Sequence, residues 1–407
     1  MKIKKVDKKY LEKLGVDLLK ITEQVLKQVI SVTNQYDGLD IDEHKLVSAF
    51  DYLDEDYQFP KHANTPTCPQ NIRECIPAKG CEVNCRYCLV VGLEGFQTDN
   101  IIYYKNYPDI FYKLIQKNIP ESHELGGLMY YFSPKTEVFT DEIIRNGITG
   151  AVLINFKKHI DKCIAKYGFC NDTLFIVTKG GYEELVMKDS SGGTMLELLI
   201  DIADNVQVST SIAPLDKDEK LRKILEPNGA SKKSRLKLVK TLQENNVFCS
   251  GLLAEPVFTP FLPDKIFFQE MYDSGIRRIA LDILTTTYKN LAIVAQLIGS
   301  IYPQKEKQMW EEYLFSDSPP KSNNRVSVSI NLQEEYYKKM IADANAVGIN
   351  LMTYCRYVCS ITNLPQLNYM DPGIEGEKGV GGCMAYINPS LPKYISKLRV
   401  AQPFSIK

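Results

Sequence analysis

The sequence contains no long hydrophobic run and almost no net charge. No apolar stretch in its 407 residues reaches the roughly 18 residues that a membrane-spanning helix needs, so no membrane partner is expected. The 49 lysines and arginines are balanced by 50 aspartates and glutamates, and the formal net charge is −1. Because binding to a phosphate backbone needs excess positive charge, duplex DNA is not expected as a substrate, although a local basic groove is compatible with this balance.

Histidine is also scarce, and the chain has no internal repeat or low-complexity tract. The four histidines are His44, His62, His123 and His159, and no two have the spacing of a metal-ligand pair, so no role is assigned to them. Residues 1–15 start basic and then turn amphipathic, which differs from a signal peptide. The composition, with 44% hydrophobic and 24% charged residues, is that of a globular protein, and we expect a cytoplasmic location.

Cysteine, in contrast, is plentiful. The chain has 11, an odd number. Disulfides do not persist in a reducing compartment, so metal ligation or thiolate chemistry is the better interpretation. Three stand close together and three form a looser group near the carboxyl end: Cys81, Cys85 and Cys88, then Cys355, Cys359 and Cys383. Cys163, Cys170 and Cys249 are expected to be core residues.

The hydrophobic pattern divides the chain into three regions, of which the first is helical. Residues 1–58 are expected to form an N-terminal helical extension, because apolar residues recur every three or four positions. This stripe consists of Leu11, Leu14, Leu18, Ile21, Val25 and Val29. A break at residues 37–40 precedes a second expected helix over residues 42–53.

Residues 59–285 are expected to form the core of an α/β fold. Short apolar runs predict strands at residues 128–132, 174–177, 206–211, 247–254 and 278–283. Helical patterns lie between them at residues 110–117, 152–166, 196–203, 235–245 and 265–274. This alternation indicates a parallel sheet, and its spacing predicts a partial (β/α)6-type TIM barrel. Such barrels carry their chemistry at the carboxyl ends of the strands.

Residues 286–407 are expected to form a C-terminal region. Helices are predicted at residues 289–302 and 332–347, with a polar loop that contains Ser318, Pro319 and Pro320 between them. A strand is predicted at residues 350–354, and the tail from residue 360 is rich in proline and glycine and is expected to be irregular.

The sequence GCEVNCRYC carries the strongest chemical signal. It places Cys81, Cys85 and Cys88 at the spacing C-x3-C-x2-C. Three thiolates on one tight loop can bind three irons of a [4Fe–4S] cube. The alternative is a structural zinc site, which needs four ligands and would recruit Cys75 or Cys68.

This motif resembles that of the radical S-adenosylmethionine (SAM) superfamily, in which Tyr87 also matches the pattern C-x3-C-x-aromatic-C. Residues 71–285 resemble the spore photoproduct lyase-like branch of that superfamily. The stretches that carry this resemblance are IPAKGCEVNCRYC, YFSPKTEVF, LFIVTKG, VQVSTSIAP, LEPNGASKKSRLKLVKTLQ and LLAEPVFTP.

The resemblance implies a mechanism and its cofactors. The fourth iron of the cluster would bind the amino and carboxylate groups of SAM, and the reduced cluster would cleave SAM to methionine and a 5′-deoxyadenosyl radical. That radical abstracts hydrogen from the substrate. A one-electron reductant such as flavodoxin or ferredoxin is therefore an expected partner.

The resemblance also implies roles for residues at strand ends. Glu137 is expected to bind the SAM amino group, Lys179 to point at SAM, and Arg235 to bind its carboxylate through a guanidinium clamp. The remaining expected SAM contacts are Tyr87, Ser209, Ser211 and Glu255. For each strand-end residue the alternative is an ordinary solvated or strand-end side chain without a ligand.

The late cysteines leave several interpretations open. Cys355, Cys359 and Cys383 can bind an auxiliary iron–sulfur cluster, or they can be buried thiols that pack as small hydrophobic groups. Cys355 can alternatively be catalytic and donate a hydrogen atom to a substrate radical. An auxiliary cluster would favour oxidative modification, because it can accept an electron.

One departure from the branch bears on the substrate. Spore photoproduct lyase keeps a hydrogen-donating cysteine soon after its cluster motif, whereas this chain has no cysteine between Cys88 and Cys163. We therefore predict a radical SAM enzyme that acts on an unidentified peptide or small molecule. The alternatives are a DNA photoproduct repair lyase and a non-catalytic, metal-bound interaction module.

Overall fold

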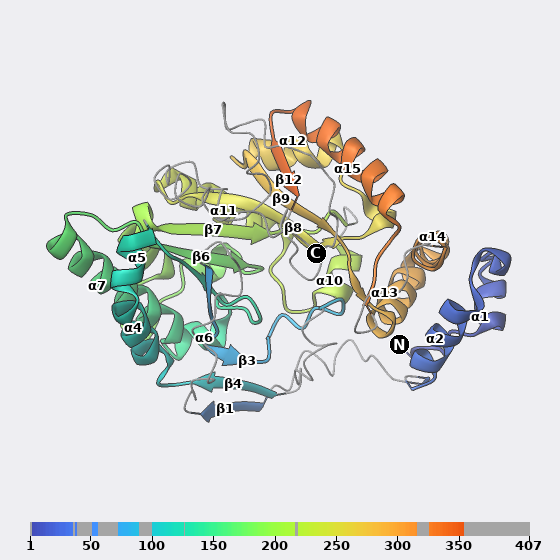
Figure 1. Ribbon diagram of the computed structural model, residues 1–407, viewed down its shortest axis with the longest axis horizontal. Helices are drawn as coiled ribbons and strands as arrows, with labels where there is room; N and C mark the ends of the chain where they lie inside the picture. The colour runs from blue at the N-terminus through green and yellow to red at the C-terminus, as the bar shows by residue number, and fades with distance from the viewer. Residues whose placement is uncertain are drawn as a thin grey trace.

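The centre of the molecule is a seven-stranded parallel sheet (Figure 1). The computed structural model describes residues 2–35, 37–38, 51–55, 72–88, 100–125, 127–215, 219–315 and 325–353. In spatial order the strands are β12 (Asn350–Thr353), β9 (Arg278–Ile283), β8 (Cys249–Val257), β7 (Val206–Ser211), β6 (Thr173–Thr178), β5 (Met129–Phe132) and β2 (Ile72–Cys75).

This strand order is also the order along the chain, which explains the partial-barrel character. Each crossover steps to the next strand in the same direction, and right-handed crossovers then bring the connecting helices to one face. β2 and β12 end the order, and no pairing joins them within the described ranges, so the sheet is open. The predicted parallel α/β sheet is confirmed, whereas β2, only four residues long, was not predicted.

Helices connect the strands and cover the sheet. Those of the core are α4 (Tyr107–Lys117), α5 (Ile119–Leu125), α6 (Asp141–Arg145), α7 (Ile148–Tyr167), α8 (Tyr182–Leu185), α9 (Met195–Ile200), η2 (Ala203–Asn205), α10 (Lys220–Leu225), α11 (Lys232–Glu244), η3 (Thr259–Phe261) and α12 (Lys265–Asp273). α11 is typical: the Ser231 hydroxyl accepts from the Ser234 N–H at its first turn, and Leu238, Val239 and Leu242 are buried on one stripe. Every predicted core helix is present, with ends that differ by a few residues.

Beyond β9 the chain is more helical than predicted. α13 (Tyr288–Ile301), α14 (Pro303–Leu314) and α15 (Ile330–Asn345) follow, and β10 (Thr286–Thr287) pairs with β11 (Arg325–Val326). The sequence analysis did not predict α14, whose charged composition resembles a loop. The helix forms because Pro303 starts it and because Met309, Trp310, Tyr313 and Leu314 share one buried face.

A second, small sheet lies beside the core. It joins β1 (Asp51–Glu55), β4 (Asn100–Tyr104) and β3 (Ala78–Lys79) in that spatial order. The helix predicted for residues 42–53 is therefore wrong at residues 51–53, where the backbone pairs with β4 as a parallel strand. Residues 42–50 of that prediction lie outside the described residues.

The N-terminal segment packs against α13 and α14, as Figure 1 shows. The predicted stripe forms α1 (Lys8–Lys13), η1 (Leu18–Lys20) and α2 (Glu23–Asn34), and the helical run is broken at Gly15, whose φ is +77°. The side-chain amide of Gln296 in α13 bonds to both backbone groups of Lys4. The Lys4 N–H donates to Oε1 of Gln296, and Nε2 of Gln296 donates to the Lys4 carbonyl, each at 2.8 Å. No helix in the described part of the chain is long and apolar enough to span a membrane.

We predict that Gln296→Ala releases the N-terminal segment. The change leaves two backbone groups of Lys4 without these partners, which costs about 1–3 kcal/mol. Hydrogen exchange should accelerate over residues 2–35, and the free energy of unfolding should fall. Gln269→Ala is the matched control, because Gln269 bonds only to the exposed Asp273. Equal protection of residues 2–35 in the two variants would contradict the prediction.

Candidate metal and cofactor site

The three motif cysteines lie on one loop that follows β3. Two backbone bonds fold it: Asn84 N–H donates to the Cys81 carbonyl at 3.2 Å, and Cys88 N–H donates to the Cys85 carbonyl at 3.1 Å. Asn84 has a left-handed backbone, with φ of 52°, which asparagine tolerates better than most residues. The loop thus turns twice within eight residues and brings its cysteines to one end of the sheet.

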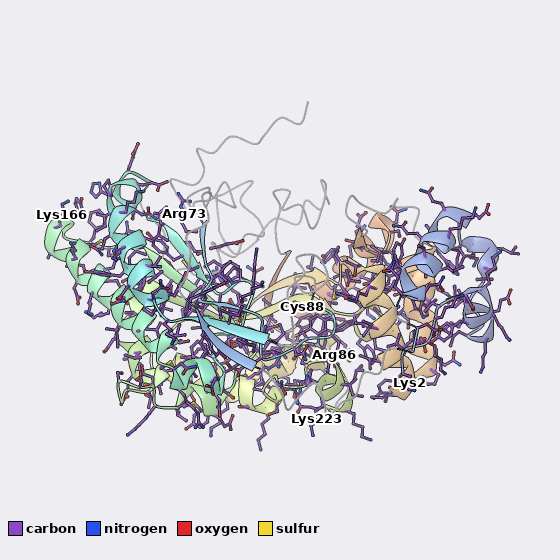
Figure 2. All side chains as sticks on the ribbon, turned by 90° about the horizontal axis from the view of Figure 1, so that it is seen from below. Lys2, Arg73, Arg86, Cys88, Lys166 and Lys223 are labelled. Carbon is purple, nitrogen blue, oxygen red and sulfur yellow. The ribbon has the colours of Figure 1, made fainter. Side chains whose placement is uncertain are left out.

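Neighbouring elements hold this loop from outside. Arg86 N–H donates to the carbonyl of Leu225, the last residue of α10, at 2.9 Å. The Asn228 amide donates to the Glu82 carbonyl at 2.8 Å, and the Asn290 amide of α13 donates to the Cys88 carbonyl at 2.9 Å. Figure 2 shows Arg86 and Cys88 together in the middle of the molecule. Side-chain amides from distant parts of the chain therefore fix the path of the loop.

The loop sulfurs are not among the potential metal ligands that lie as close together as the ligands of a single ion, within the described residues. Tetrahedral thiolates on one zinc ion, with Zn–S bonds of about 2.3 Å, lie about 3.8 Å apart. Within the described ranges, only the ligand atoms of His159, Cys163 and Cys170 all lie within 4.8 Å of one another, and the loop cysteines form no such group. A cuboidal cluster accepts wider spacing, because each cysteine binds a different iron.

Of the two proposed fourth zinc ligands, only Cys75 is described by the structure. Cys75 is fully buried in β2, and its thiol lies 3.6 Å from the Arg73 carbonyl of the same strand. Cys68 lies outside the described residues, as do Cys355, Cys359 and Cys383. The three loop cysteines match the ligand number of a [4Fe–4S] cluster with one open iron, whereas a closed zinc site needs a fourth ligand.

The three loop cysteines are half-buried, and the cations Lys179, Arg86 and Arg235 act on Cys85. Burial raises the pKa of the Cys81 thiol to about 12, and Glu137 acts in the same direction. Burial likewise raises the pKa of Cys85 well above its ordinary value, against the opposing charge of Lys179. Burial acts to lower the pKa of Lys179, but the charges of Cys85 and nearby carboxylates raise it, so Lys179 remains a cation.

Tyr87 connects the cysteine loop to a buried ion pair. Its hydroxyl donates to Glu226 Oε1, and its ring meets Phe258 edge to face at 5.3 Å. Glu226 Oε2 accepts from the Arg235 guanidinium at 2.6 Å, and the same guanidinium donates to the Ser211 carbonyl at 2.6 Å. Glu226 and Arg235 are both essentially inaccessible to solvent. This network ties the cysteine loop to α11 and to the end of β7.

Charge compensation keeps this buried carboxylate ionised. Burial acts to raise the pKa of Glu226, but Arg235, Lys179 and the Tyr87 hydrogen bond together hold it below its ordinary value. Burial acts to lower the pKa of Arg235, and the opposing charge of Glu226 raises it. Arg235, which the resemblance assigned to the SAM carboxylate, therefore already has a carboxylate partner within the chain.

Glu137 is placed as a brace between two loops. Its Oε1 accepts from the backbone N–H groups of Val138 and Phe139 at 3.0 Å and from the Thr178 hydroxyl at 2.8 Å. Its Oε2 accepts from the Lys179 N–H at 2.6 Å. These bonds join the loop after β5 to the end of β6, which are adjacent strands. Glu137 thus positions the segment that carries Lys179.

The two serines at the end of β7 differ in their partners. The Ser209 hydroxyl pairs with the Ser250 hydroxyl of β8 at 2.6 Å inside the sheet. The Ser211 hydroxyl is buried and has no hydrogen-bond partner among the described residues. Glu255 belongs to β8, and its side chain lies outside what the structure describes. Of the two serines, Ser211 is therefore the one that offers a polar atom without a partner among the described residues.

A cavity of about 400 Å³ lies between the cysteine loop and the carboxyl ends of β5 and β6. That volume lies within the range of small-molecule sites. Its walls are Glu82, Val83, Phe139, Thr140, Asp141, Lys179, Gly180, Glu184, Asn228 and Ala230. The Thr140 hydroxyl is buried without a hydrogen-bond partner in the described part of the chain. A β-carbon at Gly180 would lie 2.6 Å from the Phe139 carbonyl oxygen, so only glycine fits where these two walls meet.

The sequence analysis missed several residues that build this site. Glu226, Asn228 and Asn290 carry polar groups into buried positions, yet each stands in a stretch without a metal or catalytic motif. The only available signal was the sequence EPNGA at residues 226–230, which supplied the family resemblance without indicating a role. Their partners are distant in sequence, so only the folded chain reveals them.

We predict that Glu226→Gln destabilises the protein strongly. The neutral amide leaves the buried Arg235 charge uncompensated, which should lower the free energy of unfolding by about 3–5 kcal/mol in a denaturant titration. Glu270→Gln is the matched control: Glu270 is exposed and its Lys232 partner is only half-buried, so a loss below about 1 kcal/mol is expected. Equal losses of the free energy of unfolding in the two variants would show that the buried ion pair stabilises the protein no more than the surface pair.

Comparison with known proteins adds weak likenesses only. No family model and no curated protein matches the chain. A radical SAM methyltransferase, TsrM, from Kitasatospora setae, whose structure holds cobalamin and a [4Fe–4S] cluster, is 11% identical with a TM-score of 0.39, over 81% of this chain and 60% of its own. Methylornithine synthase (PylB) is 10% identical with a TM-score of 0.31, over 97% of this chain and 91% of its own. The chain thus spans about three fifths of the length of TsrM, and likenesses this low carry no argument about chemistry.

Proposed function

We propose that the chain is a radical SAM enzyme that abstracts hydrogen from a peptide or small-molecule substrate. Cys81, Cys85 and Cys88 would hold a [4Fe–4S] cluster, which, when bound, supplies the electron that cleaves SAM. The main support is the position of the three-cysteine loop beside a ligand-sized cavity at the carboxyl ends of parallel strands. This is the edge where α/β barrels carry their chemistry.

The cavity lining suits a ligand that carries both positive and negative groups. Asp141 and Glu184 can face the ammonium and sulfonium charges of SAM, and Lys179 can face its carboxylate. Thr140 offers a buried hydroxyl that makes no other bond among the described residues. In this proposal Lys179 binds the ligand directly, while Glu137, Tyr87 and Arg235 are positioning residues, because the oxygens of Glu137, the Tyr87 hydroxyl and both terminal nitrogens of Arg235 are bonded to other groups of the chain.

The remaining parts of the proposal concern the chain beyond this cavity. Residues 59–285 would form the catalytic core, next to the helical extension of residues 1–58, and the C-terminal region of residues 286–407 adds β12 to the core sheet. Cys355, Cys359 and Cys383 would hold an auxiliary cluster, or Cys355 would donate hydrogen. A flavodoxin or ferredoxin would supply electrons in the cytoplasm. Membership of the spore photoproduct lyase-like branch rests on the sequence stretches quoted above.

We predict that removing any loop cysteine abolishes the cluster. Anaerobic reconstitution of the intact chain should yield about four irons from this loop, a brown chromophore and formation of 5′-deoxyadenosine from SAM under reducing conditions. Cys81→Ser, Cys85→Ser and Cys88→Ser should each lose all three. Cys249→Ser serves as the control, because this buried thiol lies in β8 and contacts Thr210. A colourless protein with stoichiometric zinc in the loop would refute the assignment.

We predict separately that Lys179→Met weakens SAM binding and leaves the iron content unchanged. Loss of a charge-assisted hydrogen bond is worth about 1.5–3 kcal/mol, so the dissociation constant should rise about tenfold or more. Calorimetric titration of the reconstituted protein with SAM measures it. Lys240→Met, an exposed lysine on α11, is the control. An unchanged dissociation constant for SAM in Lys179→Met would show that Lys179 does not bind SAM.

A further inference from the structure

A second cluster of potential metal ligands lies at the opposite edge of the sheet. His159, Cys163 and Cys170 place one ligand atom each within 4.8 Å of the others. His159 and Cys163 are one turn apart near the end of α7, and Cys170 follows two residues after the Gly168 cap. Because α7 leads into the start of β6, the cluster belongs to the amino ends of the strands. Lys166, in the last turn of α7, lies far from Cys88 in Figure 2.

A carboxylate fixes the orientation of the histidine. His159 Nε2 lies 2.7 Å from Asp172 Oδ2, and both side chains are fully buried. The Ser122 hydroxyl and the Leu128 N–H donate to the other oxygen of Asp172, so this carboxylate is itself held. In metal sites a ligating histidine usually donates its second ring N–H to such a carboxylate. The arrangement leaves Nδ1 of His159 as the lone-pair nitrogen.

The Cys163 sulfur lies beside the imidazole ring, nearly equidistant from its two nitrogens, so a rotation of the Cys163 side chain would bring it in front of Nδ1 to share an ion there. The Cys163 sulfur lies 3.9 Å from His159 Nδ1 and 3.7 Å from Nε2. Sulfur and nitrogen ligands of one tetrahedral zinc, at bond lengths of about 2.3 and 2.0 Å, lie about 3.5 Å apart. Both cysteines also line a cavity of about 10 Å³, roughly the room that one water molecule needs.

One neighbouring group would have to move. The Gln116 amide nitrogen lies 3.1 Å from His159 Nδ1, while Oε1 of the same amide is buried without a hydrogen-bond partner among the described residues. Only the nitrogen of the Gln116 amide therefore has a hydrogen-bond partner among the described residues, and a metal ion on Nδ1 would displace this amide.

We propose that His159, Cys163 and Cys170 form a zinc site that is separate from the cysteine loop. Two soft sulfurs and an imidazole favour zinc over magnesium or calcium. The two thiols lose their protons to solvent on binding, and a water molecule from the adjacent cavity takes the fourth position. The ion would join the end of α7 to the start of β6, away from the carboxyl-end cavity, and with three protein ligands it would keep one position for an exchangeable water. The sequence analysis placed both cysteines in the core and gave His159 no role.

The test counts zinc in a background that cannot bind metal at the loop. Cys81→Ala/Cys85→Ala/Cys88→Ala protein is stripped with chelator under anaerobic conditions, reloaded with Zn²⁺ and desalted. Adding Cys170→Ala should remove one zinc per chain, whereas adding Cys249→Ala, at another buried cysteine, should remove none. Cys170 is partly exposed, so its truncation should leave the circular dichroism spectrum unchanged.

A second measurement does not depend on zinc counts. Co²⁺ added to the same background should give the near-ultraviolet thiolate-to-metal absorption of a tetrahedral site, which Cys170→Ala should reduce and Cys249→Ala should preserve. Zinc should also raise the melting temperature of the background protein but not that of its Cys170→Ala derivative. Equal zinc counts and cobalt spectra in the two derivatives would overturn the proposal. A Cys163–Cys170 disulfide in metal-free protein, which zinc and reductant together fail to replace, would also overturn it.

Discussion

The buried carboxylate of Glu226 is the interaction on which the candidate site depends. It accepts from Tyr87 of the cysteine loop and from Arg235 of α11, and Arg235 in turn donates to the Ser211 carbonyl at the end of β7. An isolated charge at this depth would be strongly unfavourable, so each member requires the others. The three-cysteine loop is therefore held by electrostatic compensation inside the protein, in addition to its own turns.

The direction of the sheet separates two chemical environments. All seven strands are parallel and follow one another in chain order, so their carboxyl ends face one edge and their amino ends the other. The cavity, Lys179 and the cysteine loop occupy the carboxyl edge. The His159–Asp172 pair and its two cysteines occupy the amino edge, where the Asp172 carboxylate also accepts from the first residue before β5. The two groups of potential metal ligands thus lie at opposite ends of the same strands.

The spacing of apolar residues along the sequence predicted the helices and strands in which buried positions recur regularly. The strands β7 and β9 were predicted with the bounds that the structure has, because each is a short segment between two strong helical patterns. α14 was missed because its charged residues hide a buried stripe around Trp310. The helix expected up to residue 53 failed because pairing with β4 overrides local preference at β1.

The sequence by itself determined the candidate metal ligands of the loop, since the C-x3-C-x2-C spacing is local and three thiolates on one bend need no distant partner. It also determined the parallel α/β architecture through the alternation of apolar runs and helices. Only the tertiary structure decided which polar groups bond to other groups of the chain. The carboxylate of Glu137 and the guanidinium of Arg235 have such partners, whereas Lys179 lines a cavity. The physical reason is that burial and hydrogen bonding depend on residues far apart in sequence, which meet only when the strands assemble.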